Sequence, residues 1–204
     1  VGRSHQFVLE VAAQRSVATV LPFAYRPPVV TGVQVVDAGG SAVHVEANWL
    51  RTSGESSVRL RGDSMGPAGI HQLRARYGPS GSEFDVACTL VRAHEELLCR
   101  TAPGLGAGLQ WFAVVAGQAS NAPGPNATSY EPAVIATPRG VSGPGATNGT
   151  TRGNEDVYIA GEFFGPPASE LPSTLVARWE VTYGRTGTEY TAQNCSSDNL
   201  QQTR

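Results

Sequence analysis

His5-Gln-Phe-Val-Leu-Glu-Val-Ala-Ala-Gln-Arg-Ser16 has a near copy in Gln110-Trp-Phe-Ala-Val-Val-Ala-Gly-Gln-Ala-Ser120, and both stretches run from an aromatic-led apolar segment into Gln-x-Ser. After a short loop, Phe23-Ala-Tyr-Arg-Pro27 matches Thr128-Ser-Tyr-Glu-Pro132 in its Tyr-x-Pro. The chain therefore begins with what looks like the end of a repeat unit. We expect the missing part of that unit elsewhere, which predicts assembly.

A second pair of segments extends the repeat. Thr52-Ser-Gly-Glu-Ser-Ser-Val-Arg-Leu-Arg-Gly62 and Thr151-Arg-Gly-Asn-Glu-Asp-Val-Tyr-Ile-Ala-Gly161 are followed at the same spacing by Met65-Gly-Pro and Phe164-Gly-Pro. A period of about a hundred residues is too long for a solenoid and fits whole β-sandwich domains. We predict closing strands at 1–27, a complete domain at 28–132 and an incomplete domain at 133–204.

The composition predicts an all-β chain. With 24 Gly and 14 Pro among 204 residues, turns must be frequent, and no run of residues has a convincing helical period. The net charge of -2 gives no electrostatic footprint for nucleic acid. Neither a signal-like apolar segment nor a stretch long enough to span a membrane is present, which favours a processed or excised segment and no membrane span.

Two sets of apolar residues complement each other. The first lies on one face of the opening strands, where it would be costly to leave in water at about 1.5 to 3 kcal/mol for each large side chain. We expect these donor residues to be Phe7, Leu9, Val11, Phe23 and Tyr25. The second set alternates along strands of the incomplete domain, and we expect this acceptor core to be Val157, Ile159, Trp179, Val181 and Tyr183.

The cysteines bear on the compartment. Cys88 and Cys99 flank a short polar loop, where a hairpin would bring them to bridging distance, and the sequence favours a disulfide over two buried thiols. Cys195 has no visible partner, so it is a free thiol or is paired between chains.

A longer series of residues follows one order along the repeat. It comprises Gly62, Met65-Gly-Pro67, Tyr77-Gly78, Cys88, Cys99-Arg-Thr-Ala-Pro-Gly104, Gln118-Ala-Ser120 and Tyr130-x-Pro132, with Gly161, Phe164-Gly165 and Tyr183-Gly184 in the second unit. This series resembles the IPT/TIG family of immunoglobulin-like domains. The family implies tandem seven-stranded β-sandwiches in adhesion, receptor or scaffold roles. The sequence departs from it after Cys195, where the second cysteine and the closing strands are missing.

Several short motifs have simpler explanations than a binding or catalytic site. Arg61-Gly-Asp63 places its glycine where the family has a bulge, which argues against integrin binding, and the glycines of Gly104-Leu-Gly-Ala-Gly108 lack the strand and helix that a phosphate loop needs. The polar groups His44-Val-Glu46, His94-Glu-Glu96, Glu83 and Asp85 lack further ligands at metal spacing. With no catalytic cluster discernible, we expect neither an enzyme nor a cofactor.

Three sequons favour a secreted glycoprotein. Asn126-Ala-Thr, Asn148-Gly-Thr and Asn194-Cys-Ser all fall in predicted loops, and the cysteine inside the last makes it the weakest. Together with the disulfide they predict an extracellular or cell-surface location with covalent glycans.

Two functional hypotheses remain. In the first, the chain is a structural protomer of an extracellular fibre, a homopolymer joined head to tail when residues 1–27 of one chain complete the open sandwich at 133–204 of its neighbour. In the second, it is a fragment of a tandem-repeat adhesion or receptor ectodomain. A covalently continuous array with Arg204 joined to Val1 also reads acceptably.

Overall fold

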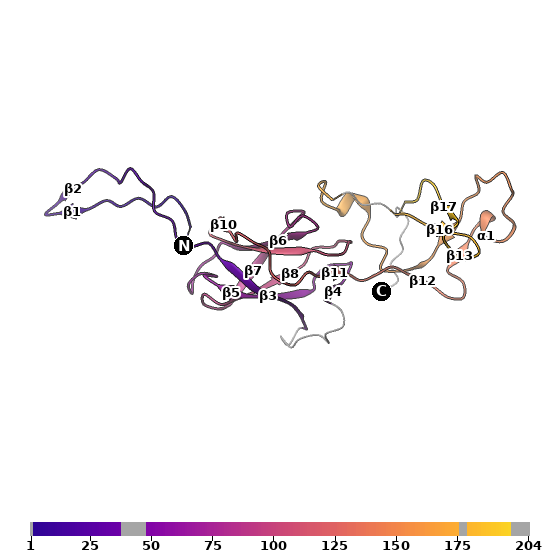
Figure 1. Ribbon diagram of the computed structural model, residues 1–204, viewed down its shortest axis with the longest axis horizontal. Coiled ribbons are helices and arrows are strands. Elements are labelled where there is room, and N and C mark those ends of the chain that lie inside the picture. The colour runs from indigo at the N-terminus through magenta and orange to yellow at the C-terminus, as the bar shows by residue number, and fades with distance from the viewer. Residues whose placement is uncertain (1, 38–47, 176–178, 197–204) are drawn as a thin grey trace. The chain divides into compact units, whose positions relative to one another are not determined.

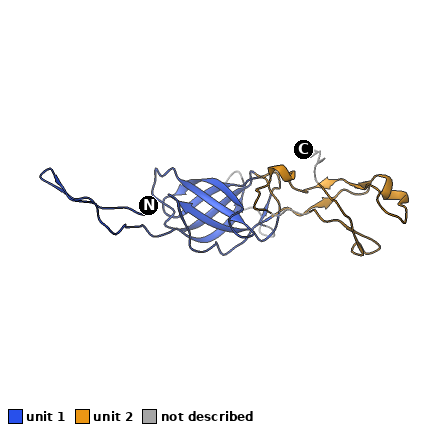
Figure 2. Cartoon of the chain, turned by 90° about the horizontal axis from the view of Figure 1, so that it is seen from above, with its two compact units in different colours: residues 1–50, 55–102, 106–129 blue, residues 51–54, 103–105, 130–204 orange. Residues whose placement is uncertain are grey.

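The computed structural model describes residues 2–37, 48–175 and 179–196. Its contacts divide the chain into two compact units, shown separately in Figure 2. Unit 1 comprises Val1–Leu50, Glu55–Ala102 and Gly106–Ser129, and unit 2 comprises Arg51–Gly54, Pro103–Leu105 and Tyr130–Arg204.

The described chain is mostly β-structure with almost no helix (Figure 1). The strands of unit 1 are β1 (Glu10–Val11), β2 (Gln14–Arg15), β3 (Val29–Val36), β4 (Trp49–Leu50), β5 (Ser57–Asp63), β6 (Leu73–Gly78), β7 (Phe84–Arg92), β8 (Glu96–Arg100), β9 (Gln110–Val115) and β10 (Gln118–Ala119). The remaining elements are β11 (Ser129–Tyr130), β12 (Val134–Ile135), β13 (Val141–Ser142), α1 (Pro144–Asn148), β14 (Tyr158–Ile159), β15 (Gly161–Glu162), the 3-10 turn η1 (Ala168–Glu170), β16 (Thr182–Tyr183) and β17 (Tyr190–Thr191).

Unit 1 is built on one curled antiparallel sheet with the strand order β10-β9-β6-β7-β8-β5-β3. The long strand β7 pairs through Phe84–Ala87 with β6 and through Cys88–Arg92 with β8. The sheet curls far enough that β3 also contacts β9, although four strands separate them in the order. The curl thereby encloses an apolar interior, because alternate side chains of each strand point inward.

The core of unit 1 is aromatic at its centre. Tyr77 stacks on Trp111 with ring centroids 4.2 Å apart and on Phe84 at 4.7 Å, and all three are at most 2% exposed. The Trp111 indole N–H donates to the Thr128 hydroxyl at 2.9 Å, which satisfies its buried polar atom. The Tyr77 hydroxyl accepts a hydrogen bond from the backbone N–H of Ala102 at 2.9 Å.

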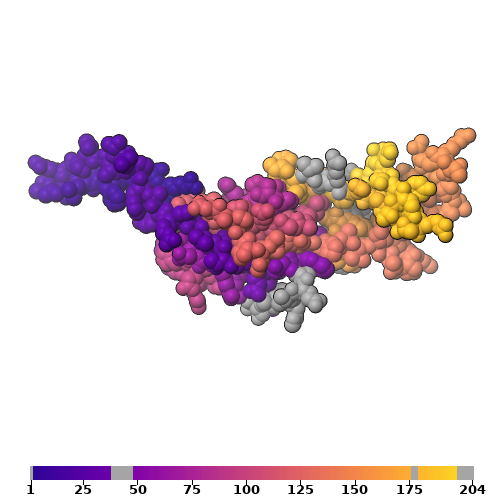
Figure 3. All heavy atoms as spheres, in the orientation of Figure 1, coloured from indigo at the N-terminus to yellow at the C-terminus, as the bar shows by residue number. Residues whose placement is uncertain are grey.

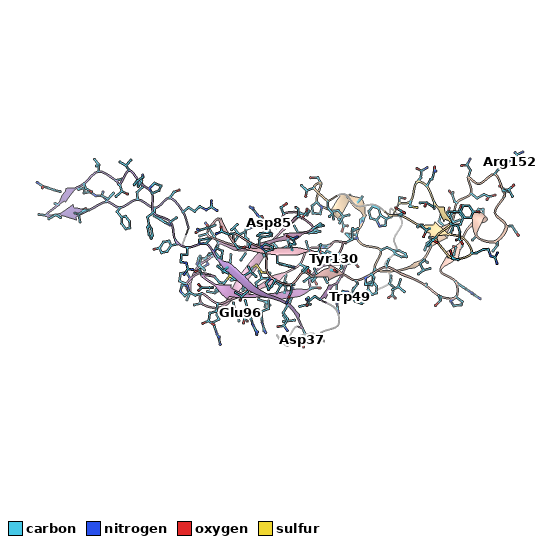
Figure 4. All side chains as sticks on the ribbon, viewed as in Figure 1. Asp37, Trp49, Asp85, Glu96, Tyr130 and Arg152 are labelled. Atoms are coloured by element: carbon cyan, nitrogen blue, oxygen red, sulfur yellow. A yellow bond between two sulfur atoms is a disulfide. The ribbon has the colours of Figure 1, made fainter. Side chains whose placement is uncertain are left out.

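A disulfide joins Cys88 of β7 to Cys99 of β8, as the sequence favoured. The two residues are direct partners across the ladder, and Cys99 is fully buried. The outer surface of this region carries ion pairs (Figure 4): Asp85 binds Arg74 at 2.7 Å, and Glu96 binds Arg59 at 3.0 Å.

Unit 2 contains three separate two-stranded pairs, β12 with β15, β13 with β14 and β16 with β17. The strand expected over Trp179–Tyr183 is shorter than the alternation suggests, since only Thr182 and Tyr183 have ladder partners in the described residues. Although short, the β12–β15 and β16–β17 pairs retain pairings found in unit 1.

A candidate assembly interface

Residues 2–27 form an irregular N-terminal hairpin. At its tip Val11 pairs with Gln14 and Glu10 with Arg15, around a turn in which Ala12 and Ala13 have φ of 47° and 64°. These positive values are those of a tight hairpin turn, whose twist matches that of its flanking strands.

The tip repeats the geometry of β9 and β10 in unit 1. There Val115 pairs with Gln118 around Ala116 and Gly117, whose φ values are 48° and 76°. The next hydrogen bond corresponds too, because Ser16 N donates to Leu9 O and Ser120 N to Ala113 O, each at 2.8 Å.

The base of the hairpin has a counterpart as well. His5 and Phe23 form an isolated antiparallel bridge with both backbone hydrogen bonds, and Leu109 and Thr128 form the same bridge in unit 1. The N-terminal hairpin therefore has the fold of β9, β10 and the segment leading into β11. Phe7 takes the place of Trp111.

This correspondence places the five expected donor residues at buried positions of the repeat. Their counterparts in unit 1 and β11 are Trp111, Ala113, Val115, Thr128 and Tyr130, which are 0%, 0%, 2%, 1% and 4% exposed. The donor residues Phe7, Leu9, Val11, Phe23 and Tyr25 are 63%, 67%, 60%, 45% and 50% exposed. The hairpin, the indigo segment of Figure 3, thus exposes side chains that the repeat buries in unit 1.

Unit 2 repeats the first strands of unit 1. Ile135 pairs with Gly161 as Val30 pairs with Gly62. A Cβ on Gly161 would lie 2.0 Å from Val134 O, and one on Gly62 would lie 1.8 Å from Val29 O, so both positions exclude any side chain. This close backbone approach is the physical reason for the glycine that the repeat places in both units.

The β16–β17 pair repeats β6–β7. Tyr183 pairs with Tyr190 as Tyr77 pairs with Phe84, and the two tyrosine rings are 5.3 Å apart. The glycine that opens each turn has a positive φ, 133° at Gly184 and 145° at Gly78.

In each of these turns a glutamate carboxylate accepts hydrogen bonds from backbone N–H groups of the same turn. The Glu189 carboxylate accepts hydrogen bonds from the Thr186 hydroxyl and from the backbone N–H groups of Thr186 and Thr188, and these lower its pKa to about 2. Glu83 accepts from the N–H groups of Ser80 and Ser82 in the same way. Desolvation opposes the shift at Glu83, but its hydrogen bonds prevail and its pKa is also lowered. Sequence comparison alone missed this feature.

Unit 2 buries almost nothing apolar in the described residues. Within 131–175 and 179–196 the buried residues are Gly140, Gly165 and Pro166, and none is a large apolar side chain. The expected acceptor residues Val157 and Tyr183 are 46% and 55% exposed, and Ile159, Trp179 and Val181 are half-buried. Their repeat counterparts Val58, Leu60, Leu73, Ala75 and Tyr77 are at most 5% exposed.

One contact ties the hairpin to the next domain. The Gln118 side-chain N–H donates to the backbone carbonyl of Tyr25 at 2.8 Å, so the first residue of β10 binds the segment that leads into β3. The sequence offered only a shared Gln-x-Ser as a signal for this role.

The other motifs occupy structural positions. Arg61-Gly-Asp63 lies in β5, and Glu95 and Glu96 bind arginines, Glu95 binding Arg92 at 2.8 Å. No group of three or more potential metal ligands occurs in the part of the chain that is described. The Gly104–Gly108 segment is a loop before β9, and the His44-Val-Glu46 motif lies outside the described residues.

The expected modification sites are at the surface. Asn126, Asn148 and Asn194 are all exposed. The loop expected at Asn148 is wrong, because Asn148 is the last residue of the short helix α1. The Cys195 thiol is half-buried and forms no disulfide among the described residues. No helix in the described ranges has the length and apolar character needed to cross a membrane.

Comparison with known proteins returned no match. No family model matches the chain, and neither a curated protein nor a solved structure resembles it significantly.

Proposed function

We propose that the chain is a structural protomer of an extracellular glycoprotein fibre, in which the N-terminal hairpin of one copy completes unit 2 of the next. The observation that supports this most directly is the pairing of two deficits. The hairpin exposes five residues at core positions of the repeat, and the part of unit 2 described within 131–175 and 179–196 buries no large apolar residue. The hairpin repeats the closing strands of unit 1, which are the strands that unit 2 lacks. Unit 2 repeats the first strands of unit 1, which the hairpin lacks.

The physical driving force is the burial of these side chains. Each large apolar group removed from water contributes about 1.5 to 3 kcal/mol, and the added strands also satisfy an open sheet edge. The hairpin and unit 2 are different surfaces of the same chain, so the contact is heterologous. Such a contact generates an open filament when its rotation does not close a ring.

The domains joined in this way are immunoglobulin-like sandwiches of the IPT/TIG type under this proposal. The curled sheet of unit 1, the aromatic cluster around Tyr77 and the disulfide between Cys88 and Cys99 support that assignment. The disulfide and the three exposed sequons support an extracellular location.

The role is mechanical and self-associating, without catalysis or a cofactor. Three of the carboxylates singled out in the sequence support this, because Asp85 and Glu96 form ion pairs and Glu83 accepts turn hydrogen bonds. The partner is a second copy of the chain, and neither a nucleic acid nor a membrane span is part of the proposal.

The test is a charge placed on the donor face of the full chain. Leu9→Asp would bury a carboxylate without a partner at a core position, which costs several kcal/mol in general. We expect negative-stain microscopy and sedimentation to show fibres for the native chain and soluble protein for Leu9→Asp. The matched control is Val17→Asp, since Val17 is 89% exposed and lies beyond the strand-forming part of the hairpin. Fibres that persist unchanged in Leu9→Asp would refute the mechanism.

A tandem-repeat ectodomain is the second candidate. This candidate is favoured because the repeat continues without a break from the hairpin into β3. Gln118 holds the connecting segment by its hydrogen bond to the Tyr25 carbonyl. In that case the same strands would pair within one longer chain, and the isolated 204-residue chain would stay monomeric at all concentrations.

A further inference from the structure

The repeat defines which residues should face each other across the proposed contact. In unit 1, β6 and β9 pair with Tyr77 opposite Trp111, Arg76 opposite Phe112 and Ala75 opposite Ala113. This ladder sets the stack of Tyr77 on Trp111, whose planes are 7° apart.

The counterparts of both strands are present, but apart. Tyr183 of β16 holds the position of Tyr77, and the segment around Phe7 holds that of β9. In the described residues β16 pairs only with β17, so its other edge corresponds to the edge of β6 that receives β9. Thr182 and Tyr183 are both exposed.

We infer that the N-terminal hairpin of one copy binds β16 of another in a single register, with Phe7 opposite Tyr183, Val8 opposite Thr182 and Leu9 opposite Val181. The inference rests on the proposed function and specifies its site. In this register the Phe7 ring stacks on Tyr183, in place of Trp111 on Tyr77.

Geometry disfavours other registers. A shift of one residue would turn Phe7, Leu9 and Val11 to the outer face, because side chains alternate along a strand. A shift of two would keep the faces but would move Phe7 away from Tyr183 and so lose the aromatic stack. It would also lose a hydrogen bond at the far end of the interface.

The same register places Gln14 beside Tyr130 of the other copy. Gln14 pairs across the hairpin turn as Gln118 does in unit 1. Tyr25 corresponds to Tyr130, because each lies two residues after the second partner of its bridge. Since Gln118 donates to the Tyr25 carbonyl at 2.8 Å, Gln14 of one copy should donate to the Tyr130 carbonyl of its neighbour. The stack at Phe7 and this hydrogen bond fix the two ends of the interface.

Cysteine pairs measure the register. Val8 and Thr182 should be direct cross-strand partners, with Cβ atoms about 4.5 to 5.5 Å apart, whereas Val8 and Glu180 would be diagonal neighbours about 7 to 8 Å apart. Only the first pair meets the geometry of a disulfide. All three side chains lie on the outer face, so their replacement should spare the core.

The experiment mixes two full-length variants in a Cys195→Ser background, which leaves the Cys88–Cys99 bond intact. Each variant carries one added cysteine. One carries Val8→Cys and the other Thr182→Cys, and the control mixture pairs Val8→Cys with Glu180→Cys. Mild oxidation followed by a non-reducing gel should give dimers in the first mixture and at least tenfold fewer in the second.

The possible outcomes separate the register from the function. Fibres with preferential cross-linking of Glu180→Cys, or with none in either mixture, would overturn the register and leave strand donation standing. Absence of any self-association under all conditions would overturn the proposed function itself. Because each cross-link joins two different chains, it cannot arise by closure of one chain on itself.

Discussion

Phe7 and Phe23 lie side by side in the N-terminal hairpin with ring centroids 5.8 Å apart, at the two positions where Trp111 donates a hydrogen bond to Thr128 in unit 1. An indole and a hydroxyl need each other when buried, because each carries a polar atom. Two phenyl rings carry none, so the exposed hairpin can enter a core without leaving a polar atom unpaired. The substitution suits a strand that is first exposed and later buried.

The first prediction concerns this aromatic pair. Phe23→Thr should raise the critical concentration for assembly about tenfold to a hundredfold, since it removes a large apolar side chain from the interface at a cost of about 1.5 to 3 kcal/mol. The double variant Phe7→Trp/Phe23→Thr recreates the pair found in unit 1 and should recover part of the loss. Sedimentation across a dilution series measures both. Additive effects of the two changes would contradict direct coupling of these positions.

The second prediction concerns the hairpin turn. Gln14→Ala should weaken assembly about threefold to tenfold, because one neutral hydrogen bond contributes about 0.5 to 1.5 kcal/mol. The measurement is the rate of fibre disassembly after dilution. Gln6→Ala removes an exposed amide from the same hairpin and serves as the control. Equal effects of the two substitutions would argue against a specific role for Gln14.

The third prediction follows from the depressed pKa of Glu189, which lies at about 2 in the folded turn against an ordinary value of 4.5. The ionised carboxylate binds the turn more strongly than the protonated one. Its stabilisation is therefore fully present above pH 4.5 and is lost as the pH falls toward the folded-state pKa. NMR titration should give a midpoint near 2 for Glu189 and, between these values, a falling protection factor for amide exchange at Thr186.

Glu189→Gln is the matching control. The amide keeps the size of the side chain but cannot change its charge, so the exchange rate at Thr186 should no longer respond through this group. A Glu189 midpoint at its ordinary value would show that the turn hydrogen bonds do not persist in solution.

The fourth prediction concerns modification. Protein from a secretory host should carry N-linked glycan on Asn126 and Asn148, because both side chains are exposed, and lower occupancy at Asn194, whose sequon contains Cys195. Glycopeptide mass spectrometry measures each site separately. Unmodified Asn126 and Asn148 in native material would count against the extracellular assignment.

The sequence by itself determined the repeat, the β-structure and the residues that matter most for it. Strand alternation is local, so Phe7, Leu9 and Val11 were assigned to one face without knowledge of any partner strand. The glycines at 62 and 161 could also be matched from spacing alone. A short loop between Cys88 and Cys99 was sufficient to favour their disulfide, which the structure contains.

Other features depend on the folded chain. The tight turn that holds Phe7 at the position of Trp111 needs positive φ values at Ala12 and Ala13, which the sequence does not indicate. The hydrogen bond from Gln118 to Tyr25 and those that Glu189 accepts in its turn both link a side chain to the backbone. Their partners depend on where the backbone runs, and the residue types alone do not reveal this. Burial depends on strands distant in the chain, and only the folded arrangement shows that unit 1 has an apolar interior while the acceptor residues of unit 2 remain uncovered.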